Sequence, residues 1–339
     1  MSRVARGLLR NGLVKENTGH TPSNIGRPRR ILTPVPESRH VVGVKLTADT
    51  AYGVVSDLLG SVGTTAEVPL PAPVNGSVPV SDTMDVVARL IQRLAELVPT
   101  FDGIGISVGG TVTRRDVHRG VFLGWRDVPL ADLVEAATGA PVVVTNDVTA
   151  LAREQLWFGA GRTHSTFGVI TVGAGLGFGV VREGHVLEQL VDDGHLLAHA
   201  PVTGSAGPRC DLGHSGCVAS YLDLSTVARR VGTTSSPSSP ETGHAIFTEG
   251  RVRDDGALAL AHLVVTVAGA VQTERMVLAG EDVSHLVASP AFSRTLEDRL
   301  RDETGLPRID LDISVEPSTF TDWARGAAVV GIQHILGAL

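Results

Sequence analysis

The sequence predicts an α/β protein built from two lobes, because three features occur together in its 339 residues. Short apolar runs of strand length alternate with amphipathic helical segments, as expected of sheets covered by helices. This pattern restarts near Thr166, which indicates two related halves. The length also exceeds the roughly 250–300 residues that one hydrophobic core usually fills. We therefore expect two cores rather than one.

The first unit, residues 1–39, is expected to be a helix over residues 2–14 followed by a hairpin wing. The arginines of this helix are spaced by three and four residues and share one face: Arg3, Arg6 and Arg10. Polar turn residues precede a second basic cluster that belongs to the wing: Arg27, Arg29 and Arg30. Both clusters favour contact with an anionic partner, and a solvated basic tail is the alternative.

The first lobe is expected over residues 40–160. Its strands are apolar, β-branched runs between turn residues, at 41–46, 51–58, 61–68, 103–108 and 141–145. Ser81 or Asp82 can cap the helix that lies between the third and fourth strands. A second helix begins at Asn146-Asp147, directly after the last strand.

The second lobe is expected over residues 161–339 and is mostly helical. Its strands are 166–172, 178–182, 276–278 and 311–315, and its closing helix at 322–339 can pack back on the first lobe. The apolar run 257–271 is interrupted by His262 and is shorter than the ~18 residues that a membrane span needs. We interpret this run as a buried helix and expect no membrane partner.

Charge and cysteine content restrict the class of function. The net charge of −7 gives the chain no general attraction to nucleic acid or acidic lipid. The first forty residues nevertheless carry a charge of +6, which leaves −13 on the remainder. Arginines interrupt the stretch where a secretory signal needs its apolar core, and only two cysteines occur. We therefore expect a cytoplasmic protein in which any attraction to an anionic partner is local.

Two candidate site features follow buried strands, the position at which ligand sites of α/β sheets are usually found. Asp147 can act as a general base toward a substrate hydroxyl, and helix capping by Asn146 or Asp147 is the alternative. Four alternating glycines can let backbone N–H groups approach a phosphate: Gly173, Gly175, Gly177 and Gly179. A hairpin in which glycine only relieves crowding has the same pattern.

The two cysteines, Cys210 and Cys217, lie within eight residues of each other. Zinc requires four tetrahedral ligands, and these thiols together with His195 offer three. Asp211 or His214 is the candidate for the fourth ligand. The sequence leaves open both a zinc cofactor and a loop that packs without metal.

These features together resemble the ROK family, which comprises repressors, open reading frames and sugar kinases. The similarity covers nearly the whole chain and depends on four stretches: 124–130, 141–150, 173–179 and 320–328. Membership implies an α/β, two-lobed actin-like fold of the ribonuclease H-like, sugar-kinase and Hsp70 type, preceded here by a partial winged helix. It also implies a homodimer or homotetramer.

The nucleotide-binding strand of the family is altered in this chain. In the family it ends in Asp-x-Gly-Gly-Thr-Lys, which helps to hold phosphates and metal, whereas residues 45–50 are Lys-Leu-Thr-Ala-Asp-Thr. A cation replaces a carboxylate, and side chains replace both glycines. We therefore expect neither ATP with Mg²⁺ nor phosphoryl transfer. The resemblance leaves Asp147 as the vestige of the general base.

The resemblance also implies a partly retained sugar site. The family's Glu-x-Gly-His corresponds to residues 192–195, and a later glutamate has become Ala219. The expected ligand-binding residues are Asn146, Asp147, Asp192 and His195. Leu212 replaces the middle cysteine of the family's zinc motif. The expected metal ligands are therefore His195, Cys210 and Cys217.

Family repressors carry an N-terminal winged helix-turn-helix, and residues 2–14 resemble its recognition helix, with residues 26–30 as the wing. A basic helix can enter the major groove while wing arginines meet phosphates. The expected DNA contacts are Ser2, Arg3, Arg6, Arg27, Arg29 and Arg30. Met1 falls at the start of the recognition helix. This predicts either a start codon assigned too far downstream or a repressor descendant with weakened operator binding.

The leading hypothesis from the sequence is a transcriptional regulator, similar to xylose and N-acetylglucosamine repressors, that senses a sugar or sugar derivative and alters operator binding. A sugar-binding pseudokinase without DNA binding is the first alternative. Ligand-dependent stabilisation without an effect on DNA would favour it. An ATP-dependent sugar kinase is the second alternative, and sugar-dependent ADP release that requires Asp147 would favour it.

Overall fold

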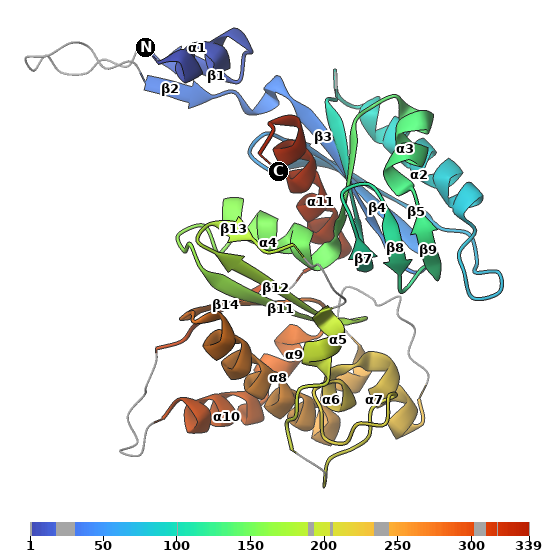
Figure 1. The fold of residues 1–339 in the computed structure, drawn as a ribbon, viewed down its shortest axis with the longest axis vertical. Helices are drawn as coiled ribbons and strands as arrows, with labels where there is room; N and C mark the ends of the chain where they lie inside the picture. Colours follow the sequence, from blue (N-terminus) through green and yellow to red (C-terminus); the bar gives the residue numbers. More distant parts are fainter. Residues whose placement is uncertain are drawn as a thin grey trace, which may run out of the picture.

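The computed structural model describes residues 2–17, 31–99, 101–188, 193–203, 206–233, 244–301, 310–316 and 318–338, and for 193–195 only the backbone. These residues form a small N-terminal unit and two α/β lobes. In Figure 1 the N-terminal unit and the first lobe lie above the second lobe. Each lobe is built on one five-stranded sheet.

The first sheet has the strand order β10-β6-β3-β4-β5. Its strands are β3 (His40–Leu46), β4 (Thr50–Asp57), β5 (Val62–Pro69), β6 (Gly103–Val108) and β10 (Val142–Asn146). β3, β6 and β10 are parallel, whereas β3, β4 and β5 form an antiparallel meander. β6 and β10 are buried along their whole length, which explains their continuous apolar runs.

The second sheet repeats this topology, with the order β13-β12-β11-β14-β15. Its strands are β11 (Phe167–Val172), β12 (Leu176–Arg182), β13 (His185–Val186), β14 (Arg275–Ala279) and β15 (Asp312–Glu316). Again the first strand of the lobe pairs antiparallel with the second and parallel with the strand on its other side. The repeat confirms the two-lobed actin-like fold that the sequence predicted.

Helices α2 (Val80–Ala95) and α3 (Leu130–Thr138) pack against the first sheet. α2 buries Val87, Leu90, Ile91 and Leu94, which follow the helical period. It begins directly after Pro79 and has no side-chain cap. The prediction that Ser81 or Asp82 caps α2 is therefore wrong. Both residues lie inside its first turn, where the Asp82 carboxylate still faces the positive end of the helix dipole.

Helices α4 (Asp147–Trp157) and α11 (Phe320–Ile335) lie between the two sheets and pack against each other. α11 rests directly on the backbone of the first sheet. A β-carbon added at Gly105 would lie 1.9 Å from the carbonyl oxygen of Ala327, and one added at Gly43 would lie 2.2 Å from that of Ala324. The closing helix therefore packs on the first lobe, although it follows the second in sequence.

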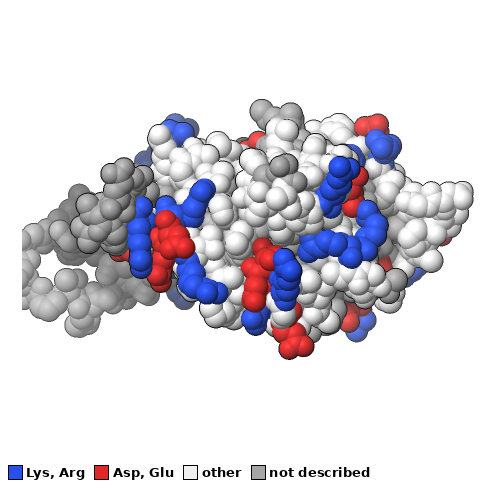
Figure 2. All heavy atoms as spheres, turned by 90° about the horizontal axis from the view of Figure 1, so that it is seen from below, with Lys and Arg blue, Asp and Glu red and all other residues white. Residues whose placement is uncertain are grey.

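The second lobe carries the remaining helices around its own core. They are α5 (Asp193–Ala198), α6 (Ala219–Leu222), α7 (Leu224–Val231), α8 (Gly250–Val271), α9 (Val283–Val287) and α10 (Pro290–Leu300). In the described part of the chain one helix, α8, is long and apolar enough to cross a membrane. It packs against α10, β11 and β14 inside this lobe, as a core helix does. Seen from below, groups of acidic and basic side chains are scattered over a mostly uncharged surface (Figure 2).

A small third sheet was not expected from the sequence. It consists of β7 (Gly110–Val112), β8 (Val117–Gly120) and β9 (Trp125–Val128). Its strands are too short to show a clear alternation of apolar and polar residues. Long-range packing stabilises it, because the buried indole of Trp125 donates a hydrogen bond to the carbonyl of Val78 at 2.8 Å.

The N-terminal unit contains α1 (Arg3–Arg10) and an antiparallel hairpin of β1 (Val14–Asn17) and β2 (Ile31–Pro34). The hydroxyl of Ser2 caps α1 by accepting a hydrogen bond from the backbone N–H of Ala5 at 3.1 Å. No residue of α1 is buried. The unit therefore has little core of its own, and its basic helix is open to solvent.

Candidate functional site

A cavity of about 640 Å³ opens between the lobes, at the carboxyl ends of β3, β10, β11 and β14. This is the edge of an α/β sheet at which ligand sites gather. Both lobes and α11 contribute to its wall, with Lys45, Asn146, Asp147, the turn 173–177, Glu281, Phe320 and Trp323. Two of the four predicted ligand-binding residues, Asn146 and Asp147, are among these.

Lys45 and Asp147 form an ion pair in this cavity. The ammonium nitrogen of Lys45 lies 2.7 Å from Oδ2 of Asp147, and the side chains are only 6% and 15% exposed. The other carboxylate oxygen accepts a hydrogen bond from the backbone N–H of Val148 at 2.9 Å. The ammonium group also lies over the ring of Trp323, 5.7 Å from its centroid. Asp147 is therefore held by a built-in cation and a backbone donor.

The side chain of Asn146 caps α4. Its oxygen accepts hydrogen bonds from the backbone N–H groups of Val148 and Thr149, at 2.9 and 3.2 Å. Its amide nitrogen donates to the carbonyl of Gly110 at 2.9 Å. The capping alternative thus describes Asn146, and one amide hydrogen remains to meet a ligand.

The turn between β3 and β4 is closed by its own side chains. The hydroxyl of Thr47 donates to the carbonyl of Thr50 at 2.9 Å and accepts from its backbone N–H at 3.1 Å. Thr47 and Ala48 also line the cavity. Side chains therefore occupy the place where glycines would expose the backbone.

The glycine-rich turn between β11 and β12 is filled by neighbouring side chains. A β-carbon added at Gly177 would lie 2.4 Å from both Thr171 Oγ1 and Val148 Cγ2. One added at Gly173 would lie 1.7 Å from Oε2 of Glu281. Packing therefore requires glycine at Gly177, beside two β-branched side chains, which supports the crowding alternative there. At Gly173 the near atom is the end of a flexible side chain, so this glycine does not decide between the two alternatives.

Glu281 was missed in the sequence. It is half-buried at the cavity wall, directly after Gly280 at the end of β14. Burial raises the pKa of its carboxyl group, and the neighbouring charge of Asp282 raises it further. The signal that could have found it is its position after a buried strand, the same rule that identified Asp147.

A cluster of two cysteines and two histidines lies at the rim of the cavity. One ligand atom from each of His199, Cys210, His214 and Cys217 lies within 4.8 Å of the others. Nδ1 of His199 is 3.6 Å from each of the two sulfur atoms. Burial raises the pKa of the Cys217 thiol, and a bound cation would favour its thiolate. The donor set and spacing fit a tetrahedral zinc site.

The cluster contains two predicted metal ligands, Cys210 and Cys217, together with the candidate His214. His199 was missed, because no cysteine or glycine motif surrounds it. Leu212, at the middle cysteine position of the family motif, is 56% exposed. His195 belongs to α5, but its side chain lies outside the described residues, as does the whole of Asp192. Their predicted roles stay predictions.

The predicted DNA contacts divide into two groups. Arg3 and Arg6 are exposed on α1, while the hydroxyl of Ser2 is engaged in capping this helix. The wing arginines, Arg27, Arg29 and Arg30, lie outside the described residues. Contact of this unit with DNA stays a prediction.

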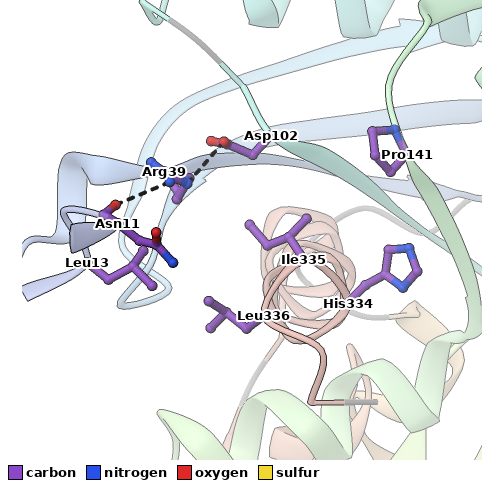
Figure 3. A pocket seen from close by; sticks show the side chains of 8 residues that line it. All are labelled: Asn11, Leu13, Arg39, Asp102, Pro141, His334, Ile335 and Leu336. Atoms are coloured by element: carbon purple, nitrogen blue, oxygen red, sulfur yellow. Dashed lines mark hydrogen bonds and ion pairs between the residues drawn. The ribbon is translucent and has the colours of Figure 1, made fainter. Parts of the chain in front are cut away.

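A second cavity, of about 490 Å³, lies between the N-terminal unit and the end of α11 (Figure 3). Arg39 spans it: its guanidinium donates to the carbonyl of Asn11 at 3.3 Å and pairs with Asp102 at 3.3 Å. His334, Ile335 and Leu336 of the α11 end line the same groove. α11 therefore extends from the ligand cavity, at its first turn, to the groove beside the N-terminal unit, at its last turn.

The ROK family model matches residues 41–330, so the chain belongs to the ROK family. Both enzymes and repressors are among its relatives. The glucokinase of Halalkalibacterium halodurans is 27% identical over 193 residues, which are 56% of this chain and 58% of that protein. The DNA-binding transcriptional repressor Mlc of Escherichia coli K12 is 23% identical over an alignment that covers 100% of this chain and 87% of Mlc.

A solved structure shows the same fold over both lobes. The crystal structure of a ROK family transcriptional regulator, described as a homologue of E. coli Mlc, superimposes with a TM-score of 0.74. The superposition covers 98% of this chain and 87% of that chain, at 18% sequence identity. At this identity the comparison supports the fold and leaves the chemistry to the residues of the cleft.

Proposed function

We propose that this chain is a sugar-responsive transcriptional regulator whose kinase-like cleft binds a ligand without phosphorylating it. The observation that carries the proposal is the ion pair between Lys45 and Asp147. Phosphoryl transfer requires a carboxylate that can accept the hydroxyl proton, and carboxylates that hold Mg²⁺ beside the phosphates. The ammonium group of Lys45 neutralises Asp147 and would repel a divalent cation at this position.

The ligand chemistry favours a sugar. Phe122, Phe320 and Trp323 contribute aromatic surface to the cavity. Among the described residues, the indole N–H of Trp323 is a buried donor without a hydrogen-bond partner. Rings that pack on the apolar face of a sugar, combined with a few polar groups, are typical of a small-molecule pocket.

Zinc is part of the proposal. His199, Cys210, His214 and Cys217 would hold the ion in a closed tetrahedral site, so its contribution would be structural rather than catalytic. His199 and Cys210 also line the ligand cavity. A filled zinc site would therefore fix this part of the cavity rim.

The proposed response reaches the N-terminal unit through α11. The helix packs closely on the backbone of β3 and β6 through small residues, so a displacement at one end would be carried to the other end as a rigid body. A ligand that displaces Phe320 or Trp323 would shift the opposite end of α11, beside Arg39 and Asn11. In this way the ligand would change how α1 is presented to DNA.

The remaining predictions fit this scheme. The proposed location is the cytoplasm, where operator DNA is accessible, and the homodimer or homotetramer stays a prediction. An ATP-dependent sugar kinase is the second candidate. It is favoured by Asp147 at the carboxyl end of β10 and by the similarity to a glucokinase.

The test combines two measurements on the purified chain. Thermal stabilisation is measured with glucose, xylose and N-acetylglucosamine, and DNA affinity is measured by fluorescence anisotropy with a fragment from upstream of its own gene. We expect at least one sugar to raise the melting temperature and to change DNA affinity. Arg3→Ala and Arg6→Ala, each made singly, should weaken DNA binding, whereas Arg182→Ala, a change of the same charge on β12, should not. Stabilisation by a sugar with unchanged DNA affinity would instead support the non-DNA-binding alternative.

A further inference from the structure

We propose that Glu281 is a specificity-determining residue. Its carboxyl group occupies the position at residues 173–177 where an anion would bind, and it thereby restricts the cleft to neutral sugars. The inference rests on the proposed function, because it names the ligand class of the same cavity. Its basis is the position of one side chain. A β-carbon at Gly173 would lie 1.7 Å from Oε2 of Glu281, so the carboxyl group is placed directly against the turn.

The backbone around Glu281 is fixed in this position. The backbone N–H of Asp282 donates to the carbonyl of Val172 at 3.1 Å, which joins the end of β14 to the end of β11. Gly280 has φ 100°, and a β-carbon there would lie 2.4 Å from the same carbonyl oxygen. The chain before and after Glu281 is therefore anchored beside the turn that its side chain covers.

The carboxyl group excludes phosphate for two reasons. Its atoms occupy the space through which a phosphate would approach the bare backbone of the turn. When ionised, it also adds a like charge beside a phosphate oxygen, which is unfavourable in a partly desolvated cavity. The steric reason holds in both protonation states, whereas the electrostatic reason applies to the carboxylate alone.

The rest of the cavity favours the same ligand class. Among the described residues, four acidic side chains line it against the two cations Lys45 and Arg119: Asp147, Asp211, Asp223 and Glu281. Lys45 pairs with Asp147 and Arg229 pairs with Asp211, so two of these carboxylates are matched by a cation. The remaining excess, Asp223 and Glu281 against Arg119, disfavours a phosphorylated ligand, whereas the hydroxyl groups of a neutral sugar can donate hydrogen bonds to carboxylates.

The experiment compares matched pairs of ligands by calorimetry: glucose with glucose 6-phosphate, mannose with mannose 6-phosphate, and N-acetylglucosamine with its 6-phosphate. For the wild-type chain we expect the neutral member of a binding pair to bind at least about tenfold more tightly than the phosphorylated one. Glu281→Ala removes the carboxyl group from this position and should strengthen binding of the phosphorylated member about tenfold. The affinity for the neutral member should change less than about threefold.

Two further variants separate specificity from structure. Glu281→Gln keeps the size and removes the charge, so it should give part of the gain and remains available if Glu281→Ala fails to fold. Glu297→Ala, an exposed carboxylate on α10 of the same lobe, should change neither member. Tighter binding of the phosphorylated member by the wild-type chain, or no gain in either Glu281 variant, would overturn the inference.

Inorganic pyrophosphate distinguishes this inference from the proposed function. If no sugar of any pair binds the wild-type chain, the proposed function fails, but pyrophosphate still probes the turn directly. Glu281→Ala should then bind pyrophosphate about tenfold more tightly than wild type. Equal pyrophosphate affinity of the two proteins would overturn the role of Glu281 whatever the sugars do.

Discussion

The turn β3–β4 of the first lobe and the turn β11–β12 of the second lobe occupy equivalent places in the two sheets, and both face the cleft. The first turn contains no glycine and is closed by Thr47 and Ala48. The second contains glycines such as Gly173, but Glu281, which follows the end of the neighbouring strand β14, lies against it. A glycine pattern that survives in sequence therefore need not be an open phosphate site.

The two turns also differ in the charge beside them. Next to the first turn, the cation of Lys45 lies where a kinase would need a metal ion, and it pairs with Asp147. Next to the second, the carboxyl group of Glu281 lies where phosphates would need donors. On the proposed function, both lobes would oppose nucleotide binding, but through charges of opposite sign.

The largest effect is expected when a substitution breaks the ion pair of the first lobe. Lys45→Met removes the cation and leaves Asp147 unpaired at a site where the carboxylate is 15% exposed. We expect a loss of about 3 kcal/mol in the free energy of unfolding, because a desolvated charge is left without a partner. Chemical denaturation measures this. Asp147→Asn added to Lys45→Met should recover part of the loss, and equal stability of the single and double variants would contradict the coupling.

The second effect concerns the proposed zinc ion, whose candidate ligands lie in the second lobe. Cys217→Ser removes one thiolate from the cluster and should weaken Zn²⁺ binding on the order of 100-fold. Titration against a chelator of known affinity measures this change. His185→Ala, which changes an exposed histidine on β13, serves as the control. Unchanged zinc affinity in Cys217→Ser would show that this cluster does not bind the zinc ion.

The third effect tests whether the glycines of the second turn serve packing. Gly177→Ala should cost about 2 kcal/mol of unfolding free energy, because the new β-carbon would lie 2.4 Å from Val148 and Thr171. Gly175→Ala, in the turn just before β12, is the matched control, since its nearest neighbour is the ring of Phe122 at 3.1 Å. Thermal or chemical unfolding compares the two variants. Equal losses would show that crowding does not explain these glycines.

The smallest effect is a dependence of stability on pH. Burial raises the pKa of Glu281 in the folded state. The protonated group therefore contributes its full stabilisation at pH values below the pKa of the unfolded state. This stabilisation is lost as the pH rises through the pKa of the folded state. Glu281→Gln cannot ionise. Its stability relative to wild type should therefore increase from acid to neutral pH, as followed by the melting temperature. A difference that is constant across this range would contradict the raised pKa.

Much of the fold followed from the sequence, because long apolar runs identify buried strands. The expected strands at 103–108 and 141–145 agree with β6 and β10 within one residue. The third sheet did not follow, since its stability depends on contacts such as that between Trp125 and Val78, which are 47 residues apart.

The sequence predicted several residues of the site, but it did not predict which of them contact one another. Lys45 and Asp147 were both identified, but their pairing depends on the parallel register of β3, β6 and β10, which brings together residues 102 positions apart. His199 and Glu281 were missed because each acts through a neighbour in space rather than through a local motif.

ADP production by the purified chain, measured with Mg-ATP and a sugar that raises its melting temperature, tests most directly whether the cleft binds without transferring phosphate. The ion pair of Lys45 and Asp147 predicts stabilisation by the sugar with no ADP above the sugar-free rate. Sugar-dependent ADP production that disappears in Asp147→Asn would contradict the account and identify an active kinase.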